Sequence, residues 1–193
     1  MSTLGPWIET VPWQSADGTL EAAYRWQAER LGEPAEFTML GSLYPELVME
    51  RLRLYKVVEA TPSALTPFER LIAAYVTSTL NHTPHCSSGL VHKLVDVEAP
   101  ADVLDQVRSS PLSIASGDER LDAVVVYAAK LTVSPGSIDQ DDIDRLRRAG
   151  LQDLDVLDLN NIVAYYNYIN RVANGLGLKS EISADHARRA VPR

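Results

Sequence analysis

The residues best suited to chemistry in this chain lie together between Asn81 and His92. This stretch contains the only cysteine, Cys86, and three of the four histidines, among them His82 and His85. A cysteine thiolate is a strong nucleophile, and a neighbouring imidazole can act as its activating base or, when protonated, as a stabilising cation. The stretch therefore predicts a catalytic cysteine, with His85 and His82 as the groups that activate it.

Pro84 places this cysteine at the start of a helix. Proline lacks an amide hydrogen, so it is tolerated in the first turn of a helix but not in the interior. We therefore expect one helix to end near Asn81 and another to begin at Pro84, with Thr83 as its N-cap. Cys86 then takes the third helical position, where unpaired amide groups and the helix dipole favour a thiolate.

The same residue types allow two other interpretations. A free cysteine is often a small buried apolar residue, and the histidines would then be polar groups at helix ends. Alternatively, His82, His85, Cys86 and His92 supply nitrogen and sulfur ligands for a metal, and the spacing of His85 and His92 puts them on one helix face. The cluster has no carboxylate, and Pro84 separates His82 from the rest, so we expect no metal.

The rest of the chain predicts helices that position this stretch. Apolar residues recur at spacings of three and four, and no sustained alternation of apolar and polar residues occurs. We expect an all-α bundle of seven or eight helices over residues 19–178. An N-terminal arm over residues 1–18 precedes it, and a loosely attached polar tail over residues 179–193 follows it.

Local signals mark several helix boundaries. Thr66, Pro67 and Glu69 form a capping-box pattern that opens a long apolar helix. Pro45 opens an earlier helix that runs to Glu59. The remaining helices are expected over residues 19–31, 101–108, about 119–133, about 140–150 and about 154–175.

Two of these segments carry residues whose placement matters later. The candidate buried face of the helix over residues 45–59 includes Leu47, Leu52 and Leu54. The last helix carries polar residues on an otherwise apolar surface, and we expect them to bond to neighbouring helix ends rather than face a pocket. These polar residues are Asn160, Asn161, Asn167, Asn170 and Arg171. The aromatic arm, with Trp7 and Trp13, is expected to pack on the domain or on a partner subunit.

Composition excludes several classes of function. The chain has 193 residues, 46% of them hydrophobic, and 26 acidic against 18 basic side chains give a net charge of −8. A chain of this length can bury a core without disulfides or metals. It has no basic run, which argues against nucleic acid or an anionic membrane surface as a partner.

The expected location is the cytoplasm. The first residues lack the basic and apolar pattern of an export signal, and no segment reaches the length of about eighteen apolar residues needed to span a membrane. A single cysteine also fits a reducing compartment.

Two motifs resemble those of a known family. Residues 65–86 read LTPFERLIAAYVTSTLNHTPHC, and the later segments read AKLT at 129–132, RRAG at 147–150 and YYNYINRVANGLG at 165–177. Over roughly residues 31–178 the chain resembles the alkylhydroperoxidase D and carboxymuconolactone decarboxylase superfamily, in its peroxidase-related branch. The resemblance implies the helical fold of that superfamily, a small-molecule substrate and a homo-oligomer.

The resemblance also implies roles for individual residues. The peroxidases of this family use a Cys-x-x-Cys pair at a helix start, together with a glutamate and a histidine. Cys86 matches the second, peroxide-attacking cysteine. Thr83 stands at the first cysteine, Leu71 at the glutamate, and Gly89 and Leu90 where the histidine is expected. Without a cysteine at position 83 no internal disulfide can form, so turnover would need an external thiol.

Three functions follow from these observations. The favoured one is a one-cysteine, thiol-dependent peroxidase of the antioxidant type, in which Cys86 is oxidised by a hydroperoxide and restored by an external thiol reductant. The second is a cofactor-free decarboxylase or lyase, with His82, His85 or His92 transferring protons and Arg171 holding a substrate carboxylate. The third is a non-catalytic oligomeric scaffold. No cofactor is expected in any of them.

Overall fold

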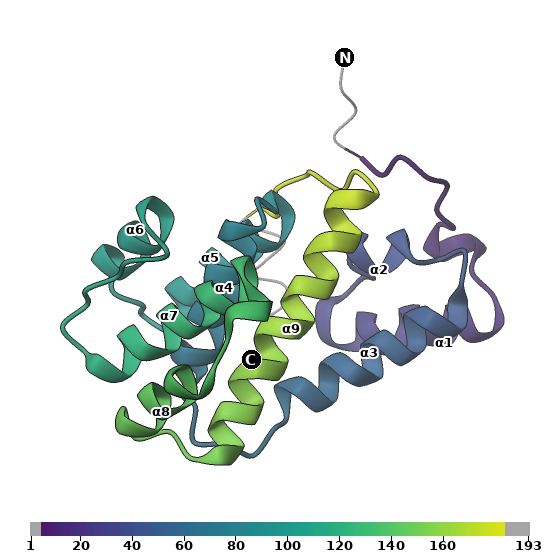
Figure 1. Cartoon of the computed structure of the whole chain (residues 1–193). Coiled ribbons are helices and arrows are strands. Elements are labelled where there is room, and N and C mark those ends of the chain that lie inside the picture. The colour runs from purple at the N-terminus through teal and green to yellow at the C-terminus, as the bar shows by residue number, and fades with distance from the viewer. Residues whose placement is uncertain (1–4, 184–193) are drawn as a thin grey trace.

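The computed structural model describes residues 5–183, apart from the side chain of Arg30 (Figure 1). This part of the chain holds nine α-helices and no β-strand, which confirms the all-α prediction. Eight of the helices have seven or more residues, and the unexpected ninth, α2, has only five. The helices are α1 (Gly18–Leu31), α2 (Glu36–Leu40), α3 (Pro45–Glu59), α4 (Pro67–Leu80), α5 (Pro84–Asp96), α6 (Ala101–Ser109), α7 (Glu119–Val133), α8 (Gln140–Arg148) and α9 (Asp153–Gly175).

Helix α4 forms the centre of the bundle. It packs against α5, α7 and α9, and its residues 72–78 are all buried. In Figure 1, α1 to α3 lie on one side of α9, and α4 to α8 lie on the other. No helix within residues 5–183 combines the length and apolar character needed to cross a bilayer.

The predicted starts of α4 and α5 are confirmed. Thr66 Oγ1 accepts a hydrogen bond from the Glu69 amide at 3.1 Å, and Glu69 Oε2 accepts one from the Thr66 amide at 2.7 Å. Helix α5 begins at Pro84, so Cys86 takes the third helical position. Thr83 occupies the N-cap position, but its hydroxyl accepts from Asn174 Nδ2 at 2.8 Å instead of capping the helix.

The prediction for α3 was wrong at two positions. Leu47 is 48% exposed and Leu54 is 51% exposed, whereas Val48, Leu52 and Val58 are buried. Among the described residues, α3 makes its main helix contacts with α1 and α9. These two helices cover a narrower face of α3 than the spacing of its apolar residues indicates. Its outer side therefore carries apolar side chains on the surface.

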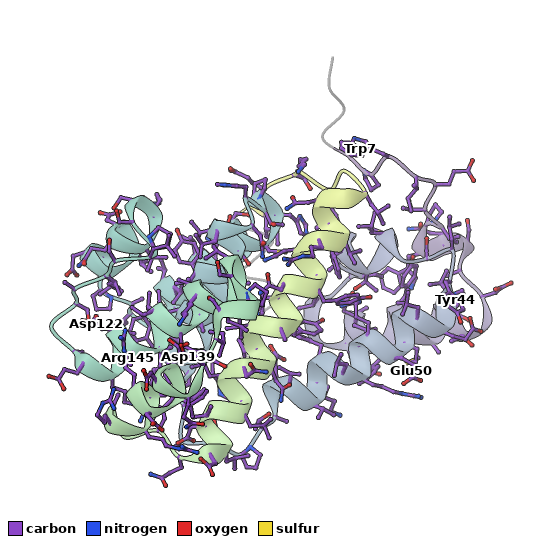
Figure 2. The ribbon with its side chains drawn as sticks, in the orientation of Figure 1. Trp7, Tyr44, Glu50, Asp122, Asp139 and Arg145 are labelled. Carbon is purple, nitrogen blue, oxygen red and sulfur yellow. The ribbon has the colours of Figure 1, made fainter. Side chains whose placement is uncertain are left out.

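The N-terminal arm packs against the domain itself. The Trp7 amide donates to the Leu176 carbonyl at 2.9 Å, and Figure 2 shows Trp7 beside the C-terminal end of α9. A Cβ at Gly177 would overlap the Trp7 indole, and Gly177 has a φ of +81°. Both observations require glycine at that position.

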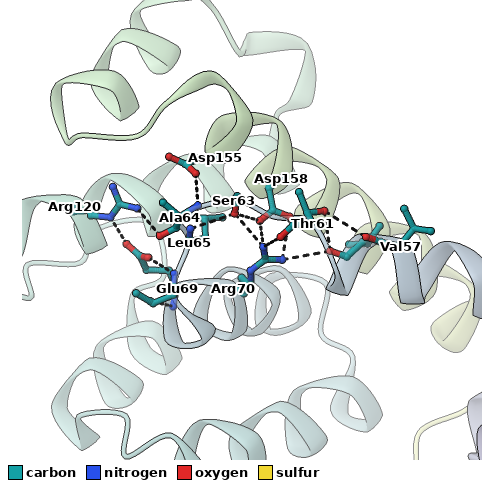
Figure 3. Close-up of polar contacts among 12 residues, drawn as sticks. Val57, Thr61, Ser63, Ala64, Leu65, Glu69, Arg70, Arg120, Asp155 and Asp158 are labelled. Carbon is teal, nitrogen blue, oxygen red and sulfur yellow. Dashed lines mark hydrogen bonds and ion pairs between the residues drawn. The ribbon is translucent and has the colours of Figure 1, made fainter.

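A buried ion pair joins α4 to α9 (Figure 3). Asp158 is fully buried, and its carboxylate receives Arg70 Nη2 at 2.6 Å and Nη1 at 3.1 Å. The Ser63 hydroxyl also donates to Asp158, and Arg70 Nη2 donates to the Thr61 carbonyl at 2.6 Å. The pair therefore fixes the loop between α3 and α4 as well as the two helices.

A second set of contacts lies beside this pair. Arg120 of α7 pairs with Glu69, the capping residue of α4. The Asp155 carboxylate accepts from the Ala64 amide at 2.6 Å. The beginning of α4 is thus held by α7 and α9 at once.

Removing Arg70 should destabilise the protein strongly. The Arg70→Met change leaves the buried Asp158 carboxylate without its cation, and we expect a loss of about 3–5 kcal/mol in the free energy of unfolding, measured by urea denaturation. The double change Arg70→Met with Asp158→Leu removes both charges and should recover most of that loss. A double variant as unstable as the single one would contradict this account.

Candidate functional site

Cys86 lines a pocket of about 180 Å³ between α3, α5 and α9. Aromatic rings from α3 and α9 and the chain that follows α9 form part of its wall. We call it the Cys86 pocket. A larger cavity of about 580 Å³ adjoins it and shares Tyr55, Lys93 and Tyr166 as walls.

The thiol is protonated in this environment. Burial raises the pKa of Cys86 from 9.0 to about 12. This direction is opposite to the lowering expected from the helix start. Loss of solvent around the sulfur disfavours the charged form more than the amide groups of the first turn favour it.

The structure brings one of the two predicted histidine partners to the pocket. The His85 ring is buried and lines the Cys86 pocket, with its Nδ1 3.0 Å from the Ser180 carbonyl oxygen and 3.7 Å from Glu36 Oε2. His82 is exposed in the turn between α4 and α5, with a φ of 50°, and it does not line the pocket. His85 is therefore the histidine placed to act with Cys86.

His92 lies farther along the same face of α5, as its spacing from His85 predicts. Its Nε2 is 3.1 Å from the Ile182 carbonyl oxygen. The two rings thus contact the chain that follows α9. Across the described residues, no three His, Cys, Asp or Glu side chains converge as metal ligands do.

The polar tail is held against α5 in its described part. The Ile182 amide donates to Ser88 Oγ at 2.9 Å, and the Ile182 side chain lines the Cys86 pocket. Ile182 Cδ1 lies 2.8 Å from where a Cβ on Gly89 would be, so glycine permits this close approach. We call residues 180–182 the C-terminal strap. The expectation of a loose tail was wrong for these residues, and residues 184–193 lie outside the described part.

Sequence reasoning missed the cationic residues of the pocket. Arg51 of α3 and Lys93 of α5 line it, whereas Arg171, the arginine proposed to bind a carboxylate, is exposed and bonds to Asn167. Nothing in the local sequence marks Arg51 or Lys93, because each lies on a helix surface that becomes a pocket wall only when α3, α5 and α9 pack together.

Three tyrosines form the aromatic wall. The Tyr55 and Tyr165 rings stack with centroids 5.4 Å apart, and the Tyr166 ring meets Tyr165 edge-on at 5.9 Å. Burial raises the pKa of Tyr165 to about 12, although the nearby Arg51 acts in the opposite direction. Burial also raises the pKa of Tyr166, so the hydroxyls of Tyr165 and Tyr166 are protonated at neutral pH.

The positions matched by family resemblance have ordinary structural partners. Thr83 is buried and bonded to Asn174, and Leu71 lines the larger cavity. Gly89 and Leu90 line the Cys86 pocket. The pocket thus presents a cysteine thiol without a second cysteine or a carboxylate at the matched positions.

Polar residues of α9 hold the turn that precedes α5. Asn170 bonds to Ser78, Asn167 accepts from Asn81 Nδ2 at 2.9 Å, and Asn174 donates to the Asn81 carbonyl at 2.8 Å. Asn160 accepts from Tyr127 at 3.0 Å. The prediction that these polar groups bond to neighbouring helices is confirmed for these residues, while Asn161 is exposed.

Solved structures share this arrangement of helices. An uncharacterized peroxidase-related protein from Ralstonia eutropha, described as an alkylhydroperoxidase D core, is 20% identical with a TM-score of 0.79, covering 96% of this chain and 97% of its own. A peroxidase-related protein from Silicibacter is 21% identical with a TM-score of 0.75, covering 90% and 92%. The predicted alkylhydroperoxidase D-like fold is therefore confirmed.

A debrominase has the same fold. The debrominase Bmp8 is 16% identical with a TM-score of 0.75, covering 98% of this chain and all of its own. A variant of that enzyme with a cysteine replaced by alanine, solved in complex with 2,3,4-tribromopyrrole, gives a TM-score of 0.73 at 18% identity and covers 98% and 96%. No protein-family model matches the chain, and no curated protein matches it.

The raised pKa of Cys86 predicts slow alkylation by iodoacetamide. A pKa of about 12 instead of 9.0 lowers the thiolate fraction at pH 8 roughly thousandfold, and the greater basicity of the thiolate restores roughly twenty- to thirtyfold in reactivity. We expect the folded protein to react about thirty- to sixtyfold more slowly than the urea-unfolded chain. The folded rate should rise about tenfold per pH unit between pH 8 and 10.

The same shift affects stability with a definite sign. Above pH 9 the unfolded thiol loses its proton while the folded thiol keeps it, so this group lowers the free energy of unfolding as the pH rises.

An alkylation rate that levels off near pH 9 would show that the folded thiol ionises normally.

The C-terminal strap should control access to the thiol. Ile182→Ala removes apolar cover from the Cys86 pocket, so water should reach the sulfur and alkylation by iodoacetamide should accelerate several-fold at fixed pH. Val95→Ala, an exposed position on the same helix as Cys86, is the matched control and should leave the rate unchanged. Equal rates in both variants would mean that the strap does not shield the thiol.

Proposed function

We propose that the protein is a one-cysteine, thiol-dependent reductase, with hydroperoxides as its leading substrate class. The observation that carries the proposal is the position of Cys86, which lies at a helix start, lines a pocket and sits beside a buried histidine, His85. The shared fold with peroxidase-related proteins supports it. The larger of the adjoining cavities offers a route for a substrate to approach.

The chemistry balances without a second cysteine. The Cys86 sulfur attacks the terminal oxygen of a hydroperoxide, the O–O bond breaks, and the thiol proton passes to the departing alkoxide, which leaves a sulfenic acid and an alcohol. Two external thiols then restore Cys86, giving their own disulfide and water. His85, whose ring lines the same pocket, is our candidate for carrying the proton.

Reductive dehalogenation is the second candidate. The Cys86 pocket is walled by aromatic rings and has about the volume of cavities that bind benzene, which are near 150 Å³. A debrominase shares the fold. In this reaction the thiol hydrogen replaces bromine on the ring, and the bromine passes to the Cys86 sulfur. Two external thiols then restore the Cys86 thiol, forming their own disulfide and releasing hydrogen bromide.

The acid–base alternative receives less support from the geometry. Arg171 is exposed and lies outside the Cys86 pocket, as does His82. A homo-oligomer, a cytoplasmic location and the lack of nucleic-acid or membrane partners stay predictions from the sequence. The apolar surface of α3 at Leu47, Leu54 and Val57 is consistent with the oligomer.

Trapping the oxidised cysteine tests the proposal. The protein is treated with cumene hydroperoxide in the presence of dimedone, and in parallel with 2,3,4-tribromopyrrole and dithiothreitol. We expect mass spectrometry to find a dimedone adduct on Cys86 and none in Cys86→Ser. In His85→Gln the adduct should form about a hundredfold more slowly. His82→Gln, changed at an exposed histidine, is the control and should react normally.

The two substrates separate the outcomes. Hydroperoxide consumption supports the peroxidase, and bromide release without hydroperoxide consumption supports the dehalogenase. If neither reaction depends on Cys86, the protein is not a thiol-dependent reductase.

A further inference from the structure

Among the described residues, the two cations of the Cys86 pocket hydrogen-bond to neutral partners. Arg51 donates from Nη2 to Thr38 Oγ1 at 2.7 Å and from Nη1 to the Tyr165 hydroxyl at 3.4 Å. Lys93 Nζ donates to the Tyr55 hydroxyl at 3.4 Å. Both side chains are partly buried. Within residues 5–183, neither forms an ion pair with a carboxylate.

Three other partly buried cations pair with carboxylates, whereas Lys179 donates to the Asn174 amide oxygen at 3.0 Å. Arg70 pairs with Asp158 at 2.6 Å, Lys130 pairs with Asp142 at 2.6 Å, and Arg120 pairs with Glu69. Removing a cation from water costs free energy that a nearby anion repays. The two pocket cations therefore carry positive charge that the described protein does not balance by direct contact.

The surrounding carboxylates are placed elsewhere. Glu36 Oε2 accepts from the Ser180 hydroxyl at 2.6 Å and lies 3.7 Å from His85 Nδ1, and Glu36 does not line the pocket. Glu59 and Asp96 line the larger cavity and do not line the Cys86 pocket. The walls of the smaller pocket thus include Arg51 and Lys93 and no carboxylate, although Lys93 also borders the larger cavity.

The rest of the pocket has the shape of a ring site. Its volume is about 180 Å³, and cavities of about 150 Å³ admit a single benzene ring. The stacked rings of Tyr55 and Tyr165 connect the two cations. Arg51 donates to the Tyr165 hydroxyl, and Lys93 donates to the Tyr55 hydroxyl. The Arg51 guanidinium also lies over the Phe37 ring, with Arg51 Cζ 4.9 Å from the ring centroid.

We propose that the Cys86 pocket binds a single-ring aromatic anion, with the ring against Tyr55 and Tyr165 and the negative charge on Arg51 and Lys93. This inference rests on the proposed reductase function: the hydroperoxide or ring bromide that reacts at Cys86 would be carried on such a ring anion. The binding itself needs no reaction at the thiol. A charge-assisted hydrogen bond to each cation provides both affinity and orientation of the ring toward Cys86.

Binding is tested on the full-length Cys86→Ser protein, in which the thiol chemistry cannot occur. The probes are benzoate, its neutral analogue benzamide and the ringless anion acetate, titrated by isothermal calorimetry at constant ionic strength. We expect benzoate to bind at least about tenfold more tightly than either of the others, because only benzoate offers both the ring and the charge.

Variants assign the charge recognition to the two residues. Lys93→Gln and Arg51→Gln should each weaken benzoate binding about tenfold and leave benzamide binding unchanged, and Lys93→Arg should restore most of the lost affinity. Arg171→Gln, at an exposed arginine outside the pocket, is the control. Thermal melting of each variant identifies any loss of folding, and Lys93→Gln suffices if Arg51→Gln does not fold.

Equal binding of benzoate and benzamide would overturn the inference, and so would a benzoate preference that survives both substitutions. Acetate binding as tight as benzoate would also overturn it, because the ring would then contribute nothing. Failure of the proposed reductase is a separate result, since it is measured by Cys86 oxidation and bromide release. A ring anion that binds but never reacts would contradict only the proposed reductase function.

Discussion

The fully buried carboxylate of Asp158 is the constraint on which the rest of the bundle depends. An ion of this kind is tolerated only when its charge and its lone pairs are satisfied, so Arg70 and Ser63 must meet it. Their positions fix the start of α4 and the preceding loop against α9 (Figure 3). Because α4 is the buried centre of the fold, this pair also determines where its far end, and hence α5, can lie.

The far end of α4 is tied to the same helix by neutral bonds. Asn170 and Asn174 reach the Ser78 hydroxyl and the Asn81 carbonyl, so α9 holds both ends of α4. The turn that follows carries His82 at a positive φ and delivers Pro84 to the first position of α5. Cys86 is therefore positioned by helix contacts, and Ile182 of the C-terminal strap and Ala35 of the loop before α2 add non-helical walls to its pocket.

Local sequence signals predicted the helix starts, because capping and the missing amide of proline act within a few residues. Thr66 caps α4, Pro67 takes the first position of α4, and Pro84 takes the first position of α5. The exposure of Leu47 and Leu54 could not be predicted in this way, since it depends on how much of α3 its neighbours cover. The raised pKa of Cys86 and the pocket position of Arg51 depend likewise on packing between segments distant in sequence.

The raised pKa and the pocket cations together restrict the chemistry. Burial is the cause of the shift at Cys86, so the charges of Arg51 and Lys93 do not compensate for desolvation of the sulfur. A bound anion would oppose a thiolate further. The reaction must then use the protonated thiol, and both proposed reactions do so. In hydroperoxide reduction the thiol proton goes to the alkoxide, and in dehalogenation the thiol hydrogen goes to a ring carbon.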